Sequence, residues 1–271
     1  MRVMEALREG KRILEKEGIE EPFLNAVILL SSAAGWERWE AWVKEEIPED
    51  VAGRYFEYIE KRKKRVPVEY ITGKVKFCEL ELVVYSGVFI PRPETEEVAE
   101  VALREIEGIK NPVIYDIGTG TGCIALWIKK KRPDATVFST DIDKRAVENA
   151  KENAKRLGIE ISVLEGDLFS PLHDKPAPDL IVSNPPYIPE GKELPPEVRY
   201  EPEDALFGGK KGRKIIERII HEGKDILKRE GKMVIEIDPA NLPLNIPPCF
   251  SYEIRKDPAG KERILILRRK E

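Results

Sequence analysis

The pattern of hydrophobic positions divides the chain into a helical N-terminal part and a longer part in which strands and helices alternate. Over residues 1–65, apolar side chains recur at helical spacing, and Gly18, Pro22 and Gly35 stand where helices would end or begin. A segment rich in β-branched residues is lacking there. The pattern therefore predicts a small helical bundle over residues 1–65.

Residues 66–90 have a different pattern, in which short alternating segments surround several glycines. This pattern predicts a linker that contains a β-hairpin. Residues 91–271 then hold four helical patterns, over 94–109, 122–132, 143–157 and 213–229, and seven strand candidates: VIYDI, TVFSTD, ISVL, DLIVSN, KMVIEI, SYEIR and ERILIL.

This alternation is typical of a doubly wound α/β domain with a mainly parallel sheet. The last two strand candidates are joined by the turn sequence DPAGK, which predicts an antiparallel hairpin at the sheet edge.

Composition narrows the class of protein. The chain has 271 residues, 41% of them hydrophobic and 35% charged, with a net charge of −4. It has no apolar run long enough for a membrane helix, and its charged, amphipathic start predicts no signal peptide. Three widely spaced cysteines argue against a disulfide framework and fit a reducing cytosol. Two histidines and no CxxC pair argue against a structural zinc site.

A glycine-rich loop, DIGTGTG, follows the first strand of the alternating region. Its spacing is G-x-G-x-G, unlike the G-x-G-x-x-G of dinucleotide sites, and Asp116 before it suits a cationic ligand better than a pyrophosphate. Asp141 ends the second strand, where a carboxylate can accept both hydrogen bonds of a ribose diol. These features favour S-adenosylmethionine, which carries an amine, a sulfonium and a ribose. The alternative is a tight strand–helix turn without a ligand.

The tetrapeptide GDLF follows the third strand. Asp167 can accept a hydrogen bond from an adenine amino group, and Leu168 can pack on the adenine ring. An aspartate that only caps a turn is the alternative. The position of Asp167 beside the other two strand ends favours a role in ligand binding.

The fourth strand ends in SNPPYIP, which brings chemistry to the same sheet edge. Two prolines fix the loop, Asn184 offers an acceptor and donors, and Tyr187 offers a flat ring. The Asn184 side-chain oxygen and the Pro185 carbonyl can hold the N–H groups of an amide or an amino-substituted base. No conventional base is evident in the motifs, so catalysis would come from positioning and from acceptors matched to the developing charge. A proline-rich turn without chemistry is the alternative.

With these motifs, the chain resembles the bacterial release factor glutamine methyltransferases, the HemK-type family. The resemblance covers nearly the whole chain and rests on these segments: RVPVEYITG, FIPRPETEE, DIGTGTGCIAL, DIDKRAVENAKENA, GDLF, SNPPYIP and EPEDALFGGKKG. The last of these looks like a segment that closes over the active site. Residues 238–250 are short and proline-rich where the family usually has a helix. The resemblance therefore does not predict the structure of the distal edge of the sheet.

The resemblance implies a class I (Rossmann-like) methyltransferase that uses S-adenosyl-L-methionine and releases S-adenosyl-L-homocysteine. It implies N5-methylation of the glutamine in the Gly-Gly-Gln motif of class 1 peptide chain release factors. Arg92, Pro93 and Thr95 would shape the cofactor pocket. The substrate glutamine would be bound by the NPPY residues Asn184, Pro185, Pro186 and Tyr187, and Asn184 would also contact the cofactor. The remaining cofactor site would comprise Asp116, Ile117, Gly118, Thr119, Gly120, Thr121, Asp141, Asp167 and Leu168.

The sequence leaves alternative functions open. A ribosomal-protein glutamine methyltransferase shares every motif. An adenine-N6 DNA methyltransferase would need a basic DNA-binding domain, and the acidic balance and the small helical N-terminal part disfavour it. A binding module without enzymatic activity is the third class. We expect a cytoplasmic monomer without membrane or stable nucleic-acid binding, whose bundle recognises the release factor. Trp36, Trp39 and Trp42 are expected in the core of the bundle, and the run KRKKR at 61–65 is expected to be a solvated helix end.

Overall fold

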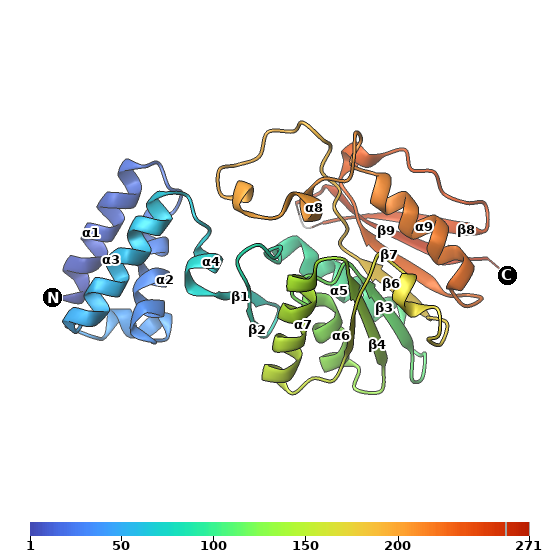
Figure 1. Ribbon diagram of the computed structural model, residues 1–271, viewed down its shortest axis with the longest axis horizontal. Helices are drawn as coiled ribbons and strands as arrows, with labels where there is room; N and C mark the ends of the chain where they lie inside the picture. The colour runs from blue at the N-terminus through green and yellow to red at the C-terminus, as the bar shows by residue number, and fades with distance from the viewer. Residues whose placement is uncertain (258, 271) are drawn as a thin grey trace. The chain divides into compact units, whose positions relative to one another are not determined.

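The computed structural model describes residues 1–257 and 259–270, in two compact units (Figure 1). The first unit comprises Met1–Lys74 and Leu194–Tyr200, and the second comprises Val75–Glu193 and Glu201–Glu271. The first unit thus extends past the predicted boundary at residue 65. The reason is a short helix, α4 (Val68–Thr72), which contacts α2 and buries Ile71 in the core of the first unit.

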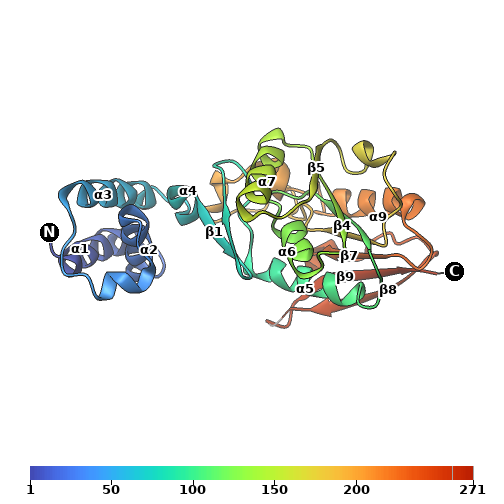
Figure 2. The same ribbon diagram turned by 90° about the horizontal axis from the view of Figure 1, so that it is seen from below.

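The first unit is the predicted helical bundle (Figure 2). Its apolar stripes meet in one core, in which Leu7, Leu30, Tyr55 and Ile59 are fully buried. The Tyr55 hydroxyl donates to the Ala6 carbonyl oxygen at 3.2 Å, which satisfies the polar end of this buried ring. The helices are α1 (Val3–Lys16), α2 (Pro22–Ala34), the 3₁₀ helix η1 (Arg38–Trp42) and α3 (Glu49–Lys63).

The tryptophan stripe is not the core feature that the sequence suggested. Trp36 is half-buried against the core, whereas Trp39 and Trp42 are 63% and 60% exposed. The segment forms a 3₁₀ helix, in which residues three apart lie on one face, so Trp39 and Trp42 share a face that points outward. Together with the exposed Val43 they form what we call the tryptophan patch.

The KRKKR run lies at the end of α3 as predicted, with Lys61 and Lys64 exposed, but its two arginines are not solvated ends. Arg62 is buried, and its guanidinium donates to Asn25 Oδ1 at 2.8 Å and to Glu197 Oε1 at 3.1 Å. Arg65 donates to the same Glu197 oxygen and to the Glu17 carbonyl at the end of α1. These two arginines therefore hold the segment Leu194–Tyr200 on the bundle, a partner more than 130 residues away that no local pattern could reveal.

The second unit contains the predicted sheet, with the strand order β5-β4-β3-β6-β7-β9-β8. The first five strands in this order pair in parallel, and β9 pairs antiparallel with β7 and β8. The bounds are β3 (Val113–Ile117), β4 (Thr136–Asp141), β5 (Ser162–Glu165), β6 (Leu180–Ser183), β7 (Lys232–Glu236), β8 (Phe250–Lys256) and β9 (Glu262–Arg269). Pro258, in the predicted DPAGK turn, lies outside the described residues.

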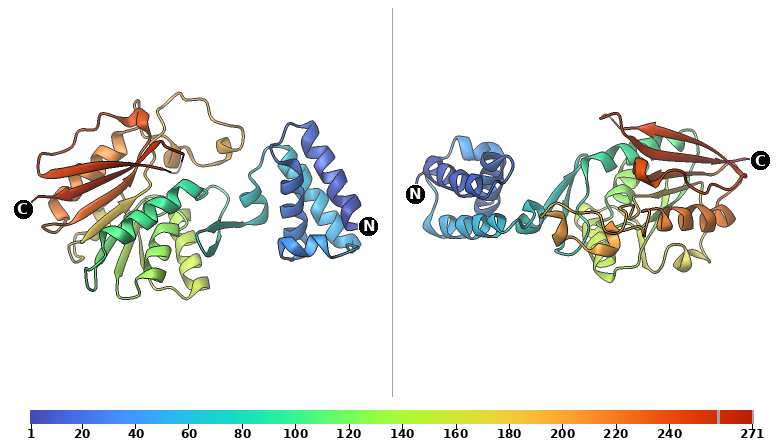
Figure 3. Two further views of the ribbon diagram at one scale, coloured as in Figure 1. Left: turned by 180° about the vertical axis from the view of Figure 1, so that it is seen from behind. Right: turned by 90° about the horizontal axis from the view of Figure 1, so that it is seen from above.

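Helices cover both faces of this sheet (Figure 3). On one face α5 contacts β6 and β7, α6 contacts β4, and α7 contacts β4 and β5. On the other face, α9 buries Ile216, Ile219 and Ile220 among strand side chains such as Ile181 and Met233. The bounds are α5 (Pro93–Glu105), α6 (Cys123–Lys131), α7 (Lys144–Leu157), α8 (Glu203–Leu206) and α9 (Lys214–Ile226), with 3₁₀ helices η2 (Ser170–Leu172), η3 (Val198–Tyr200) and η4 (Pro239–Asn241). Among the described residues, no helix has the length and apolar character to cross a membrane.

The predicted hairpin between residues 66 and 90 is present, as β1 (Lys74–Phe77) paired with β2 (Leu80–Val83). Residues 238–250 form η4 and an irregular segment rather than a helix. The distal sheet edge is nevertheless regular, because β8 pairs with β9 from Phe250 to Lys256 with one irregularity near its end.

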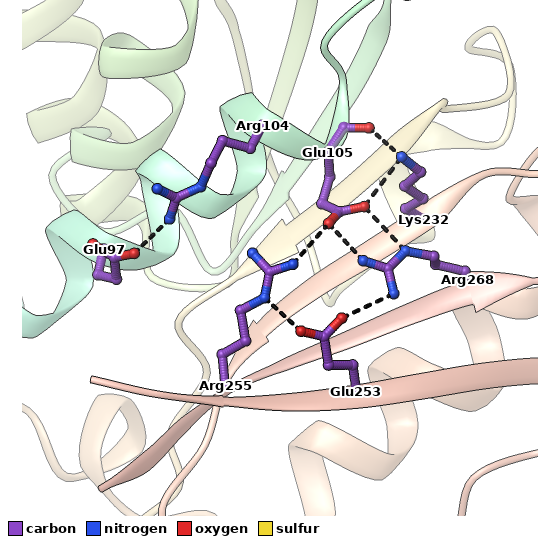
Figure 4. A network of polar contacts seen from close by, with 7 residues as sticks. All are labelled: Glu97, Arg104, Glu105, Lys232, Glu253, Arg255 and Arg268. Carbon is purple, nitrogen blue, oxygen red and sulfur yellow. Dashed lines mark hydrogen bonds and ion pairs between the residues drawn. The ribbon is translucent and has the colours of Figure 1, made fainter. Parts of the chain in front are cut away.

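A network of charged side chains fastens α5 to this edge of the sheet (Figure 4). The buried Glu105 carboxylate accepts from Arg268 at 2.7 Å and lies 3.1 Å from Lys232 Nζ and 3.6 Å from Arg255. Burial alone raises the pKa of Glu105, but the hydrogen bonds from Arg268 and Lys232 outweigh burial and hold this pKa below its usual value. Because its pKa is lowered by folding, the charged Glu105 stabilises the fold above the unfolded-state pKa.

We expect Glu105→Gln to lower the free energy of unfolding at pH 7 by about 2 kcal/mol, because three cations lose their shared carboxylate. The difference from the wild type should shrink as the pH falls through the lowered pKa of Glu105, since the wild-type carboxylate is then protonated too. Urea unfolding followed by circular dichroism at pH 7 and pH 3 measures both effects.

The control is Glu97→Gln on the same helix, which removes the exposed pair with Arg104 and should cost less than about 0.5 kcal/mol. Equal losses in the two variants would contradict the structural role of Glu105.

Candidate active site

The second unit has a cavity of about 800 Å³ at the carboxyl ends of the parallel strands. Loops that follow β3, β4, β5 and β6 line it, because parallel strands end at the same sheet edge. Twelve of the sixteen residues that we assigned to the site from sequence lie on its wall: Thr95, Ile117, Gly118, Thr119, Gly120, Thr121, Asp141, Asp167, Leu168, Asn184, Pro185 and Pro186.

The glycine loop lines the cavity with bare backbone. Gly118 and Gly120 have φ angles of +72° and +57°, which favour glycine, and a Cβ added at either would meet no atom within 4 Å. The loop is tied to β4, since the N–H groups of Gly118 and Thr119 both donate to the Thr140 carbonyl at 2.9 Å. Its shape is therefore fixed by the neighbouring strand.

Asp141 presents an oriented carboxylate to the cavity. Its two oxygens accept the N–H groups of Gly120 at 2.8 Å and Asp143 at 3.0 Å, which leaves lone pairs on each oxygen for two further donors. Burial raises the pKa of Asp141 above its usual value. Beside it, the Thr140 hydroxyl is buried and lacks a hydrogen-bond partner among the described residues. A ligand with a vicinal diol and further polar groups fits these acceptors.

Asp116 does not line the cavity, in contrast to the sequence-based assignment. It is 1% exposed and lies behind the glycine loop, where it accepts from the Thr119 hydroxyl at 2.5 Å. Burial raises the pKa of Asp116 to about 7, and the nearby Asp141 contributes to the rise. In this structure Asp116 supports the loop and adds negative potential behind it, rather than offering a contact on the wall.

Asp167 and Leu168 lie on the cavity wall as expected. The Asp167 carboxylate accepts two hydrogen bonds from the guanidinium of Arg218, at 2.9 and 3.1 Å, a partner on α9 that the sequence did not suggest. Leu168 has a φ of +47°, which is uncommon for a residue other than glycine. Such backbone strain is often retained where a side chain must be aimed at a ligand.

The loop that carries the NPPY tetrapeptide is clamped by a second segment. The Ile188 N–H donates to the Leu206 carbonyl and Gly208 N–H donates to the Ile188 carbonyl, both at 2.9 Å. A Cβ at Gly208 would lie 2.3 Å from the Pro186 carbonyl oxygen, so only glycine allows this approach. Asn241 Nδ2 donates to the Tyr187 carbonyl at 2.8 Å. The segment 201–212 therefore borders the NPPY loop, and its closure over the active site stays a prediction.

Behind the NPPY loop lies a buried chain of polar side chains. Asn184 Nδ2 donates to Thr95 Oγ1 at 2.9 Å, and the Thr95 hydroxyl donates to Glu236 Oε2 at 2.8 Å. The Tyr187 hydroxyl donates to Glu236 Oε1 at 3.1 Å. Tyr187 packs against the core and does not line the cavity, whereas the sequence-based assignment places its ring against the substrate glutamine. Glu236 was missed because a single carboxylate at the end of a strand has no sequence signature.

The observed cavity wall differs from the sequence-based assignment at Arg92, Phe89 and Ile142. Arg92 does not line the cavity; it pairs with the buried Glu201, and its guanidinium lies 5.0 Å from the ring centre of Phe89. Phe89 and Ile142 do line the cavity, and Ile142 is 67% exposed although it is large and apolar. The sequence signal that could have identified Ile142 is an apolar residue directly after Asp141, at the end of a strand. Such a side chain offers a surface on which a flat ring can pack.

This sheet order and cavity define the class of protein as a class I methyltransferase. Residues 79–198 match the family model of the methyltransferase small domain. Two solved structures share the fold: the T. thermophilus 16S rRNA methyltransferase in complex with AdoMet and guanosine, and the delta-N METTL16 methyltransferase domain. The first has a TM-score of 0.53 and 17% identity, and covers 73% of this chain and 50% of its own. The second has a TM-score of 0.52 and 18% identity, and covers 68% and 86%.

Full-length relatives define the family. Residues 5–73 match the PrmC N-terminal domain model. The release factor glutamine methyltransferase of Deinococcus radiodurans is 34% identical over 277 residues, with 99% of both chains covered. That of Geobacter sulfurreducens is 39% identical over 266 residues, covering 93% of this chain and 91% of its own. The chain belongs to the release factor glutamine methyltransferase family, as its motifs indicated.

Proposed function

We propose that the protein transfers a methyl group from S-adenosyl-L-methionine to the side-chain amide nitrogen of the glutamine in the Gly-Gly-Gln motif of class 1 release factors. The observation that carries this proposal is the meeting of two features at one cavity, the acceptors of Asp141 and the clamped NPPY loop. The relatives named above as release factor glutamine methyltransferases support the choice of substrate.

The cavity fits the proposed methyl donor. The Asp141 oxygens have free lone pairs for the ribose hydroxyls, and the bare backbone of Gly118 and Gly120 leaves room for the amino-acid part. Asp143 and Asp167 on the wall pair with Arg145 and Arg218, so the negative charge that favours a cation is assigned to Asp141. When bound there, the donor would supply an activated methyl group. Ile142 offers an apolar surface for the adenine ring.

The chain's own residues then hold the glutamine amide. Among the described residues, Asn184 Oδ1 has no donor, so it can accept an N–H of the incoming amide. An amide nitrogen is a weak nucleophile, because its lone pair is delocalised into the carbonyl. Asn184 Oδ1 and the Pro185 carbonyl would orient that nitrogen and stabilise the positive charge that develops on its N–H groups. The N–CH₃ bond would form as the S–CH₃ bond breaks, and one N–H proton would leave to solvent. The rigid loop limits the entropy lost in reaching this arrangement.

The helical bundle is the proposed recognition unit for the release factor, because a short Gly-Gly-Gln loop gives the cavity little surface to bind. The tryptophan patch is an exposed aromatic surface of the kind that dominates protein interfaces. Free cysteines at three positions suit a reducing cytoplasm, where release factors act.

Replacing Asn184 by Ala tests the chemistry. We expect kcat for methylation of intact release factor to fall by about 100-fold or more, because the acceptor for the developing charge is lost. Affinity for S-adenosyl-L-homocysteine should change by less than about threefold, since other residues supply most cofactor contacts. Incorporation of labelled methyl groups and isothermal titration calorimetry measure the two quantities.

The exposed Asn245→Ala serves as the control and should keep wild-type kcat. The wild type is assayed in parallel on a release factor, a ribosomal protein with an accessible glutamine, and DNA. Preferential methylation of either of the last two would refute the proposed substrate.

Replacing Asp141 by Asn tests the cofactor assignment. The change removes one acceptor and introduces a donor toward a ribose diol, so we expect S-adenosyl-L-homocysteine to bind about 10- to 100-fold more weakly. The matched control is Asp134→Asn, a carboxylate that also accepts a backbone N–H but lies off the cavity wall. Calorimetry that gives equal dissociation constants for wild type and Asp141→Asn would contradict this role.

Replacing Trp39 by Ser tests recognition by the bundle. If the tryptophan patch contacts the release factor, kcat/KM on the intact factor should fall by about tenfold, the loss expected for an interface aromatic. Methylation of a short Gly-Gly-Gln peptide should stay unchanged. Tyr252→Ser, an equally exposed aromatic on β8, is the control. Unchanged kcat/KM on the intact factor would place the docking surface elsewhere.

A further inference from the structure

Glu236 is a buried carboxylate that no motif assigned and that does not touch the cavity. It is the last residue of β7, and Ser183 pairs with Ile235 in the parallel register between β6 and β7. The residues that follow, Asn184 and Glu236, therefore stand at neighbouring strand ends. The first turn of α5 brings Thr95 to the same place, fully buried.

We infer that Glu236 is a positioning residue that fixes which atom of the Asn184 amide faces the substrate. This inference rests on the proposed role of Asn184. The geometry that carries it is a chain of hydrogen bonds, from Asn184 through Thr95 to Glu236, with Tyr187 donating to the second Glu236 oxygen.

The donor directions follow from the number of protons available. A carboxylate only accepts, so the single proton of Thr95 and the single proton of Tyr187 both point to Glu236. Thr95 Oγ1 then has only lone pairs left and must accept from Asn184 Nδ2. The amide oxygen of Asn184 is thereby turned away from Thr95 and left free to accept an N–H.

If the hydrogen bonds from Asn184 to Glu236 ran in the opposite direction, the substrate nitrogen would have no acceptor. A neutral group at position 236 that donates to Thr95 would let the Thr95 proton turn to Asn184. The Asn184 amide would then rotate to accept it and would present its NH₂ group to the NH₂ group of a glutamine or an amino-substituted base. Two donors cannot bond to each other, so the substrate nitrogen would lose its acceptor. The charge on Glu236 therefore selects the productive orientation.

The surroundings of Glu236 raise its pKa and so disfavour its charged form. Burial raises the pKa of Glu236 to about 7, and Glu94 on α5 adds to the rise. The hydrogen bonds from Thr95 and Tyr187 and the positive Arg263 on β9 oppose it. Cys123 on α6 is also close, and burial raises its pKa, so it stays neutral.

Tyr187 remains a donor under these conditions. Burial, followed by the charge of Glu236, raises the pKa of the Tyr187 hydroxyl well above its usual value. Among these contacts, Glu236 is the group that changes its charge close to neutral pH. The pKa of Asp116 is also raised to about 7, but Asp116 lies outside this chain of hydrogen bonds. The contribution of Glu236 is therefore the difference between the pH profiles of the wild type and a variant without this carboxylate.

The test is Glu236→Gln in the full chain, assayed by methylation of intact release factor. We expect kcat to fall at least tenfold, with KM and the affinity for S-adenosyl-L-homocysteine within twofold of the wild type. In the wild type, kcat should fall as the pH drops through about 7, because Glu236 becomes protonated. This pH dependence should be weaker in Glu236→Gln, which has no group to titrate at this position.

Thermal stability separates positioning from a structural role. Folding raises the pKa of Glu236, so its charged form destabilises the fold at pH values above that pKa. Glu236→Gln should therefore have a Tm at pH 8 equal to or above that of the wild type while it loses turnover. Glu105→Gln is the matched control, a buried carboxylate whose loss should lower Tm and leave kcat unchanged.

Two further variants keep the inference falsifiable if Glu236→Gln does not fold. Thr95→Val breaks the link to Asn184 and should also lower kcat at least tenfold. In the double variant Thr95→Val with Tyr187→Phe, adding Glu236→Gln should cause no further loss. Wild-type kcat in either Glu236→Gln or Thr95→Val would overturn the inference.

Failure of the proposed function gives a different result. The wild type would then bind S-adenosyl-L-homocysteine but would not methylate the release factor. The same variants would be compared on the ribosomal protein or DNA substrate that the wild type does methylate. The orientation of Asn184 matters equally for either kind of planar nitrogen, so the expected losses are unchanged.

Discussion

Parallel pairing of β5, β4, β3, β6 and β7 is the constraint on which the site depends. Parallel strands end at one sheet edge, so the residues that follow each strand meet there whatever their distance along the chain. Asp141, Leu168 and Asn184 reach one cavity in this way. The hydrogen bonds between β3 and its neighbours also set the shape of the glycine loop, because Gly118 and Thr119 donate to β4.

The same pairing has an electrostatic cost. Asp116, Asp141 and Glu236 are carboxylates close to a buried sheet edge, and the pKa of each is raised chiefly by burial. Apolar residues at those positions would avoid this desolvation. Strongly raised pKa values of this kind cluster at functional sites. In our proposal a cationic ligand in front of the glycine loop uses the charge there, and the Asn184 amide uses the charge of Glu236 through Thr95.

The chain after the NPPY loop belongs to both compact units. Leu194–Tyr200 is bound by Arg62 and Arg65 of the first unit, and the next residue, Glu201, accepts from the Ile90 N–H and from Arg92 in the second. The loop that holds the substrate amide in our proposal is therefore connected directly to a segment anchored on the proposed recognition unit.

The sequence by itself determined the class of fold, the mainly parallel character of the sheet and twelve of the residues on the cavity wall. These follow from local patterns, since periodicity, glycine spacing and residues at strand ends need no knowledge of distant partners. Only the tertiary structure decided where Asp116, Arg92 and Tyr187 lie and which partners they have, and it revealed Glu236, because each contact depends on a partner brought near by folding. The outward face of Trp39 and the burial of Arg62 were likewise set by packing. An amphipathic pattern predicts that a helix has a buried side, but the side chains of other elements decide which residues occupy it.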